Sequence, residues 1–404
     1  MFDENFIIRE PLLNPSQKVI GYALSWSSFS AADGSFTEKN LSSYINAIAD
    51  AFISRENGWL LEDSLIFLNA EPSLLSIDAI SRLPPKNTVF AVTAADLHDL
   101  GTFAKIIAFR ERGFGVSLKN ADFILHEKSL LTYLTHAEIN FSSADLTTQA
   151  KVYGTLKQFG IHMLARQVTD WQTFDTCASL GLDAFVGKLH LTPRATAHGK
   201  DLNPSQVTIL KLMHGVKESV EIQHLEEILK RDPTITYKLL RYINSAGFGQ
   251  RGEIQSLKQA LLLLGYNPLY RWLSLLLATS TTTGFSPVLL EAAIVRGRLA
   301  ETLGQKVMPK NEAETLFVVG MFSLLDRLLC MPMEDVLAKI QVSDAVSDAL
   351  LSRTGVYGPF LALAEACELN ATLVAALASP YHFSVEDINH SHLSALAWVK
   401  NLPT

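Results

Sequence analysis

A glycine-rich run in the second half of the chain has a spacing that could serve phosphate chemistry. Residues 247–252 read GFGQRG, which matches the G-x-G-x-x-G pattern whose backbone amides cradle a pyrophosphate. That site needs a strand before the loop and a helix after it. Here the loop follows the helical pattern Thr236–Ile243. We therefore interpret it as a connection between two helices.

Histidines near the C-terminus could offer imidazole ligands to a metal ion. His390 and His392 are two residues apart, and His382 precedes them in what we expect to be an exposed region. The chain has no His-Glu-x-x-His motif, and no carboxylate partner for the three can be identified. Since Gly-x-Ser-x-Gly and Walker motifs are also absent, we predict neither a metal nor another cofactor.

Asn69 is placed where a barrel enzyme could use an amide. It follows the apolar run Leu65–Leu68, and polar residues directly after a strand face the ligand-binding end of a parallel barrel. Taken alone, an asparagine before Pro72 is more simply a turn residue. Both interpretations stay open.

The secondary structure that the sequence predicts around these residues changes near residue 200. Before it, apolar strand patterns alternate with amphipathic helical ones, which is typical of a mostly parallel sheet. About eight strands in some 190 residues predict an α/β fold, a compressed (β/α) barrel. The expected strands are Phe6–Ile8, Val19–Leu24, Leu65–Leu68, Thr88–Val92, Gly115–Leu118, Glu138–Phe141, His162–Ala165 and Ala184–Val186.

The rest of the chain reads as helical. Residues 192–206, TPRATAHGKDLNPSQ, lose apolar periodicity and predict a linker. Beyond them, helical patterns follow one another without a convincing strand. Asp232-Pro233 and Asn267-Pro268 each provide a cap and a first-turn proline. We therefore predict a barrel over residues 1–191, a linker over 192–206 and an all-α domain over 207–404.

Composition narrows the function classes. The chain has 404 residues, enough for two or three domains, and 34 basic against 41 acidic residues give a net charge of −7. Both halves are acidic, so we do not expect nucleic acid as a partner. Three cysteines far apart in sequence fit a reducing compartment. The longest apolar stretch, Leu261–Ala278, is interrupted by polar residues, and no signal peptide is recognised. We predict a cytoplasmic protein that is not bound to membranes.

Two family resemblances cover nearly the whole chain. The opening Arg9-Glu10-Pro11-Leu12, followed by Val19–Leu24, resembles the first strands of EAL domains. Those domains hydrolyse the bacterial messenger cyclic diguanylate (cyclic di-GMP) on a barrel that holds two divalent metals. The second half resembles the HDOD domain through the pattern around Asp232-Pro233, then Lys238–Ala246 and Ile254–Leu257. The resemblance implies an EAL-HDOD signalling protein.

The chain departs from the EAL pattern at the positions that the resemblance assigns to chemistry. The metal-binding asparagine is matched by Asn69, but the acidic ligands fall on Ala23, Ala91, Lys119 and Asn120. The phosphate-binding arginine falls on Ser27, and later positions fall near Asn140, Ser142, Arg166 and Val186. Two-metal hydrolysis needs several carboxylates, so we predict that acidic side chains are missing from the barrel mouth and that the chain is not an enzyme.

The helical half departs in a similar way from the metal-dependent HD phosphohydrolases that HDOD domains resemble. Ser323 and Leu324 stand where the resemblance places a His-Asp pair of metal ligands. We expect an HDOD surface site at Arg241, Asn244 and Ser245; the alternative is that these residues only end a helix.

The sequence thus predicts a noncatalytic scaffold that binds signalling proteins and self-associates. The alternative is a receptor that binds cyclic diguanylate without cleaving it, which we rank second because the phosphate-binding arginine is missing. An active phosphodiesterase ranks third.

Overall fold

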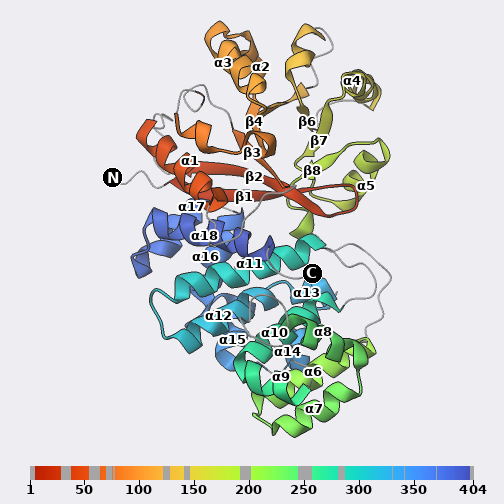
Figure 1. Ribbon diagram of the computed structural model, residues 1–404, viewed down its shortest axis with the longest axis vertical. Helices are drawn as coiled ribbons and strands as arrows, with labels where there is room; N and C mark the ends of the chain where they lie inside the picture. Colours follow the sequence, from red (N-terminus) through yellow and green to blue (C-terminus); the bar gives the residue numbers. More distant parts are fainter. Residues whose placement is uncertain are drawn as a thin grey trace. The chain divides into compact units, whose positions relative to one another are not determined.

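Eight strands close into a barrel in the first half of the chain (Figure 1). The computed structural model describes residues 5–28, 38–53, 64–69, 75, 78–121, 128–140, 146–191, 202–243, 257–280, 287–329, 331–340, 342–369 and 371–400. The strands are β1 Asn5–Leu13, β2 Val19–Ser28, β3 Leu65–Asn69, β4 Thr88–Val92, β5 Gly115–Leu118, β6 His136–Asn140, β7 His162–Arg166 and β8 Ala184–Val186. Strands β2 to β8 run parallel, and β1 runs antiparallel to both of its neighbours. The predicted barrel is confirmed.

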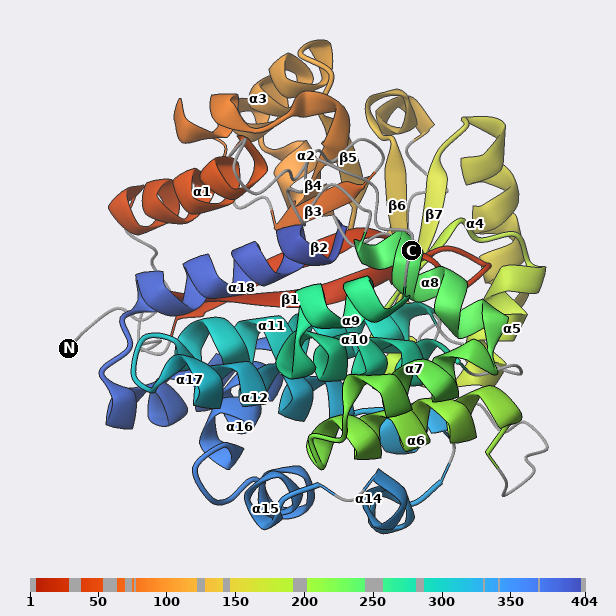
Figure 2. The same cartoon turned by 60° about the horizontal axis from the view of Figure 1, so that its bottom comes forward.

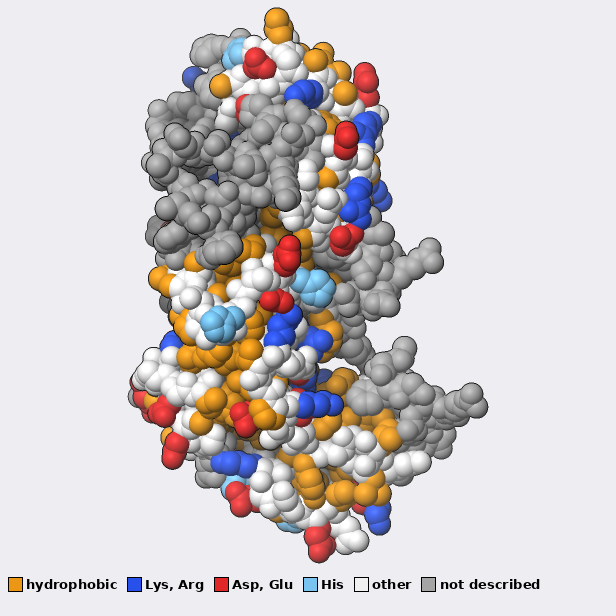
Figure 3. Space-filling model, turned by 90° about the vertical axis from the view of Figure 1, so that its left-hand side faces the viewer, with side chains coloured by type: hydrophobic (Ala, Val, Ile, Leu, Met, Phe, Trp, Pro, Cys, Tyr) orange, Lys and Arg blue, Asp and Glu red, His pale blue; other side chains and the backbone are white. Residues whose placement is uncertain are grey.

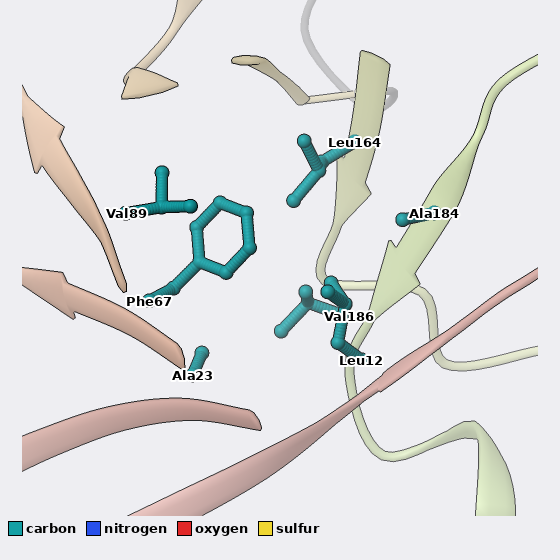
Figure 4. Close-up of a cluster of buried hydrophobic side chains, with 7 residues drawn as sticks. All are labelled: Leu12, Ala23, Phe67, Val89, Leu164, Ala184 and Val186. Carbon is teal, nitrogen blue, oxygen red and sulfur yellow. The ribbon is translucent and has the colours of Figure 1, made fainter. Parts of the chain in front are cut away.

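Apolar side chains fill the inside of the barrel. Alternate residues of a strand point to one face, so every second residue of these strands points inward. Figure 4 shows the resulting cluster, in which the Phe67 ring lies among aliphatic side chains of the neighbouring strands. The members of the cluster are Leu12, Ala23, Phe67, Val89, Leu164, Ala184 and Val186. The barrel interior is therefore a packed core up to the level of Ala23 and Phe67.

The crossovers between strands are short, which explains the compressed length. The helices between strands are α1 Glu38–Ile53, α2 Ala94–His98, α3 Leu100–Glu111, α4 Leu146–Gln158 and α5 Trp171–Ser179. The described residues between β3 and β4, and between β5 and β6, form 3₁₀ turns such as Asp78–Arg82 and Lys128–Tyr133. The helical pattern Leu97–Arg112 divides at Asp99, whose carboxylate accepts a hydrogen bond from the Thr102 amide and so caps α3.

A helical unit follows the barrel. Its helices are α6 Pro204–Lys217, α7 Ile222–Lys230, α8 Pro233–Ile243, α9 Leu257–Leu264, α10 Tyr266–Thr279, α11 Pro287–Gly304, α12 Lys310–Phe322, α13 Leu325–Leu329, α14 Met333–Ile340 and α15 Asp344–Ser352, followed by the part of α16 Gly358–Leu369 that ends at residue 364. Asn203 caps α6 through a reciprocal pair of bonds with Gln206, so this helix begins inside the predicted linker. At the centre of the unit α11 packs on α12 so closely that a Cβ on Gly320 would lie 2.4 Å from the Gly297 Cα.

The compact units do not follow the order of the sequence. One unit combines residues 1–192 with 365–397, and the other combines 193–364 with 398–404. The last two helices, α17 Ala371–Ala378 and most of α18 Val385–Lys400, therefore belong with the barrel. We predicted a single helical domain over 207–404; residues 365–397 depart from it because they bury their side chains against β1 and β2.

Two surface properties bear on the sequence predictions. Acidic and basic side chains are interspersed over the described part of the face in Figure 3. Among the described residues, no single helix is long and apolar enough to cross a membrane. One bent pair, Lys258–Leu264 with Tyr266–Thr279, passes that test of length and composition together.

Candidate functional site

The candidate site is a small pocket at the mouth of the barrel, where the parallel strands end. The strand register brings its residues together: Glu10 lies opposite Ala23 in the β1–β2 ladder, and Ala23 lies opposite Phe67 in β2–β3. We call this space the mouth pocket and define it by Glu10, Ala23, Ser25, Phe67, Ala91 and Arg166. In parallel barrels this end is where ligands bind.

An ion-pair network is the chemical feature of the mouth. The Arg166 guanidinium, at the end of β7, donates from Nε to the Glu138 carboxylate of β6, and its Nη2 lies 3.5 Å from Glu138 Oε1. Its Nη1 lies 3.5 Å from Glu10 Oε2 of β1. The Ser117 hydroxyl of β5 donates to Glu138 at 3.4 Å. Three strands thus direct charged groups to one point.

Burial differs across this network, and the difference indicates which contacts are firm. The Glu138 side chain is 3% exposed, whereas Arg166 is 27% and Glu10 is 36% exposed. A buried carboxylate needs a cation and hydrogen bonds beside it, and Arg166 supplies both. Glu10 touches the same guanidinium at a longer distance and in contact with solvent. Glu138 therefore holds Arg166 in place, and Glu10 is the partner that can be exchanged.

The structure brings together several positions that the sequence singled out. Ala23 and Ala91 are buried and line the mouth pocket. Asn69 ends β3 opposite Ala91, and its side chain lies outside the described residues. Lys119 and Asn120 follow β5, where the Lys119 amide donates to the Val92 carbonyl and Asn120 adopts φ 50°.

The sites predicted in the helical half are placed differently. Arg241 lies in α8, but its side chain, like Asn244 and Ser245, is outside the described residues, as is the glycine-rich run. Ser323 is buried at the end of α12, where its hydroxyl accepts from Arg296 Nη1 at 3.2 Å and donates to the Gly320 carbonyl. Leu324 is buried beside it. This position therefore has a structural polar contact.

The C-terminal histidines do not converge. His390 is exposed, whereas His392 is 1% exposed and its Nδ1 lies 3.2 Å from the Ile7 carbonyl oxygen. The expectation that this region is exposed is therefore wrong for His392. Burial lowers the pKa of His392 to about 3, and the Arg9 charge acts in the same direction.

Sequence reasoning missed Glu10 and Glu138 and misread Arg166. It compared only the positions that the EAL pattern assigns, and Arg166 counted as a lost glutamate. The alternation of side chains along a strand could have revealed these residues. Glu10 lies on the same face of β1 as Leu12, and Arg166 lies on the same face of β7 as Leu164. The prediction that the barrel mouth lacks acidic side chains is wrong.

The two-metal centre that the EAL resemblance implies would need several carboxylates at the mouth. Among the described residues, no three His, Cys, Asp or Glu side chains gather in a way that could hold a metal ion. Glu138 is already bonded to Arg166 and Ser117. The described donors therefore do not fit a two-metal centre.

Comparisons with known proteins found matches to both halves of the chain. Residues 202–350 match the family model for the HDOD domain. The chain is 26% identical to the Bacillus subtilis (strain 168) protein YuxH, over 98% of each chain. It is 25% identical to the cyclic di-GMP phosphodiesterase CdgJ of Vibrio cholerae serotype O1, over 98% of this chain and 93% of CdgJ. The barrel region resembles the EAL domain of Mycobacterium smegmatis DcpA, with a TM-score of 0.37, 17% identity, and coverage of 45% of this chain and 90% of that one.

One of these relatives, CdgJ, contradicts the prediction that the chain is not an enzyme. CdgJ matches almost the full length and carries the name of a phosphodiesterase. The prediction failed because it treated each acidic residue missing from an EAL ligand position as evidence against catalysis. The mouth has carboxylates at other positions. The arrangement expected from the resemblance is confirmed: a closed eight-stranded barrel is followed by a helical region that matches the HDOD domain over residues 202–350.

Proposed function

We propose that the chain acts in cyclic di-GMP signalling by binding the dinucleotide at the mouth pocket, with Arg166 as the phosphate-binding group. The observation that carries the proposal is the Arg166 guanidinium, held at the mouth by a buried carboxylate. Sequence reasoning ranked dinucleotide binding second because it found no arginine for the phosphate. Arg166 removes that objection.

The geometry of Arg166 suits a phosphodiester. Guanidinium groups bind phosphate oxygens through two parallel N–H bonds, which a lysine cannot reproduce. Glu138 occupies the Nε side of the guanidinium and leaves Nη1 directed to the partly exposed Glu10. An incoming phosphate takes the place of Glu10 and gains a charged, oriented donor. The methyl side chains of Ala23 and Ala91 leave space in the pocket that longer side chains would fill.

Hydrolysis of the same ligand is the second candidate function, and the name of the relative CdgJ supports it. Since the described donors do not fit two metal ions, the structure supplies no mechanism for this step. Product analysis in the presence of magnesium or manganese tests it directly, and it uses the same samples as the binding experiment. The partner proteins and self-association expected from the sequence stay predictions.

Isothermal titration of the full chain with cyclic di-GMP tests the proposal. We expect binding by the unaltered chain and at least about tenfold weaker binding by Arg166→Lys. The variant keeps the positive charge but loses the two parallel N–H donors of the guanidinium. Arg231→Ala, at an exposed position after α7, is the control and should bind as the unaltered chain does. No heat from the unaltered chain at high micromolar ligand would refute the proposal.

A further inference from the structure

The strand that carries Glu10 is held from outside the barrel by the last helix of the chain. The Asn389 Oδ1 of α18 accepts a hydrogen bond from the Ile7 amide at 2.8 Å, and His392 Nδ1 lies 3.2 Å from the Ile7 carbonyl oxygen. A carbonyl oxygen only accepts, so the His392 Nδ1 carries the proton and donates. Figure 2 shows α18 running beside β1. One residue of β1 thus has both backbone groups bonded to one helix.

These bonds form at a part of β1 that does not pair with β8. β1 pairs with β8 only at Leu12 and Leu13, so in the described part of the chain the outer edge of β1 has no strand beside Ile7. Buried backbone groups must find partners. Asn389 and His392, three residues apart and so on one face of α18, supply them. They are 8% and 1% exposed, so water does not compete for these bonds.

A buried ion pair fixes the same strand close by. Arg9 Nη2 lies 2.9 Å from Glu368 Oε1 of α16, and the two side chains are 5% and 2% exposed. Because side chains alternate along a strand, Arg9 points outward to this helix while Glu10 points inward to Arg166. The helical contacts outside the barrel and the ion pair at its mouth are therefore made by adjacent residues of one strand.

We infer that Asn389 and His392 are positioning residues for the mouth: by clamping β1 they hold Glu10 within reach of Arg166, and so they limit access of the dinucleotide phosphate to the guanidinium. This inference rests on the proposed function of the mouth pocket. The two contacts at Ile7 and the mouth contact at Glu10 lie roughly 10 Å apart along the strand, the length of three residues. We call the two bonds from Asn389 and His392 to Ile7 the β1 clamp. When these bonds are lost, Glu10 is no longer held beside Arg166, and Arg166 Nη1 becomes available to the phosphate.

The first test follows hydrogen exchange in the ligand-free full chain. Asn389→Leu removes the acceptor for Ile7, and we expect the peptide of residues 5–13 to exchange about tenfold faster, with a smaller rise in the peptide containing Arg166. His390→Ala, at the exposed neighbouring position, is the matched control. His392→Asn keeps a donor near the Nδ1 position and should protect β1 better than His392→Leu. Unchanged exchange in Asn389→Leu, or a rise in residues 5–13 alone, would overturn the inference.

The second test measures cyclic di-GMP affinity by titration. Asn389→Leu should bind several-fold more tightly than the unaltered chain, and its effect should vanish in a Glu10→Gln background, since the clamp acts through Glu10. Weaker binding, or an equal effect in both backgrounds, contradicts the inference. If the unaltered chain binds nothing, the proposed function fails by itself, and the exchange experiment still decides whether the clamp controls the mouth.

Discussion

At the scale of single residues, the mouth depends on one buried carboxylate and the guanidinium that neutralises it. Glu138 is almost fully enclosed, and an enclosed charge without a partner is costly. A buried ion pair adds little stability compared with apolar side chains of similar size. The pair is therefore better explained by the proposed binding role of the mouth pocket than by a contribution to stability.

Removing the competitor for Arg166 should favour the ligand. Glu10→Gln takes away the negative charge 3.5 Å from Arg166 Nη1 and leaves Glu138 in place. We expect cyclic di-GMP to bind several-fold more tightly, because the phosphate no longer displaces an anion from a partly exposed pair. Titration at low and high salt measures the effect, which should shrink as salt screens the pair. Weaker binding by Glu10→Gln would mean that the carboxylate assists the ligand.

Removing the guanidinium should destabilise the barrel unless its partner is removed as well. Arg166→Met leaves the Glu138 charge buried, with an expected cost of about 3–5 kcal/mol. The double variant Arg166→Met with Glu138→Leu should recover most of that loss, since no uncompensated charge remains. Denaturation followed by hydrogen exchange of the barrel strands reports both values. Equal losses in the single and double variants would contradict the described pairing.

Acid should loosen the β1 clamp through His392. The folded pKa is lowered to about 3 by burial and by Arg9, whereas an unfolded histidine titrates near 6.5. Between these values the unfolded chain binds a proton that the folded chain excludes, so stability is complete above about pH 6.5 and falls as the pH drops. The slope is about 1.4 kcal/mol per pH unit for one such group.

That measurement must distinguish the contribution of His392 from the effects of its neighbours and from the titration of a second histidine. Glu368 and the bond to Ile7 favour the protonated form of His392 without outweighing burial. Burial, helped by His162 and Arg110, also lowers the pKa of His136 in β6 to about 3. His392→Asn should therefore remove about one proton from the pH dependence between pH 6.5 and 5 and leave the His136 contribution. An unchanged slope would contradict the assignment.

At the scale of elements, most of the fold could be predicted from the spacing of apolar residues, which differs between strands and helices. The predicted strands Thr88–Val92, Gly115–Leu118 and Ala184–Val186 agree in both bounds with β4, β5 and β8, whereas Phe6–Ile8 covers only part of β1, which has nine residues. The site was harder to predict because inward-pointing charges such as Glu138 look like ordinary strand interruptions. Which side of α18 meets β1 depends on a contact between residues 382 positions apart, and periodicity within one helix holds no information about it.

The contact between α11 and α12 gives a prediction at this scale. Gly297 and Gly320 let the two helix backbones meet, and a Cβ on Gly320 would overlap the Gly297 Cα. Gly320→Ala should therefore destabilise the helical unit by about 1–3 kcal/mol through overpacking. Gly154→Ala, in α4 where a Cβ meets nothing within 4 Å, should instead be neutral or slightly stabilising. Thermal unfolding of both variants checks the difference; equal midpoints would argue against the close packing.

At the scale of the whole molecule, the barrel is a discontinuous unit. Residues 365–397 contribute to it although the helical unit lies between them and the strands in sequence. One consequence is that α18 is shared: Asn389 and His392 group with the barrel, whereas Trp398 groups with the helical unit, where Arg271 lies 5.4 Å from its ring centroid. The barrel unit therefore includes most of α18 as well as the strands, and changes in α18 should alter the hydrogen exchange of β1.

Truncation tests this discontinuity. A chain ending at residue 384 lacks α18, which leaves the Ile7 backbone groups without their partners and removes the buried side chains of Ile388, Leu393 and Leu396 from the barrel. We expect trypsin to cleave the barrel strands readily, while residues 202–350 stay more resistant. A chain ending at residue 400 should behave as the full chain does.

Trp398→Ala in the full chain separates the loss of the indole from the loss of the clamp. This variant should weaken the helical unit and leave β1 protected. If the chain ending at residue 384 keeps β1 protected from exchange, α18 is not part of the barrel's stability, and the clamp has to be abandoned.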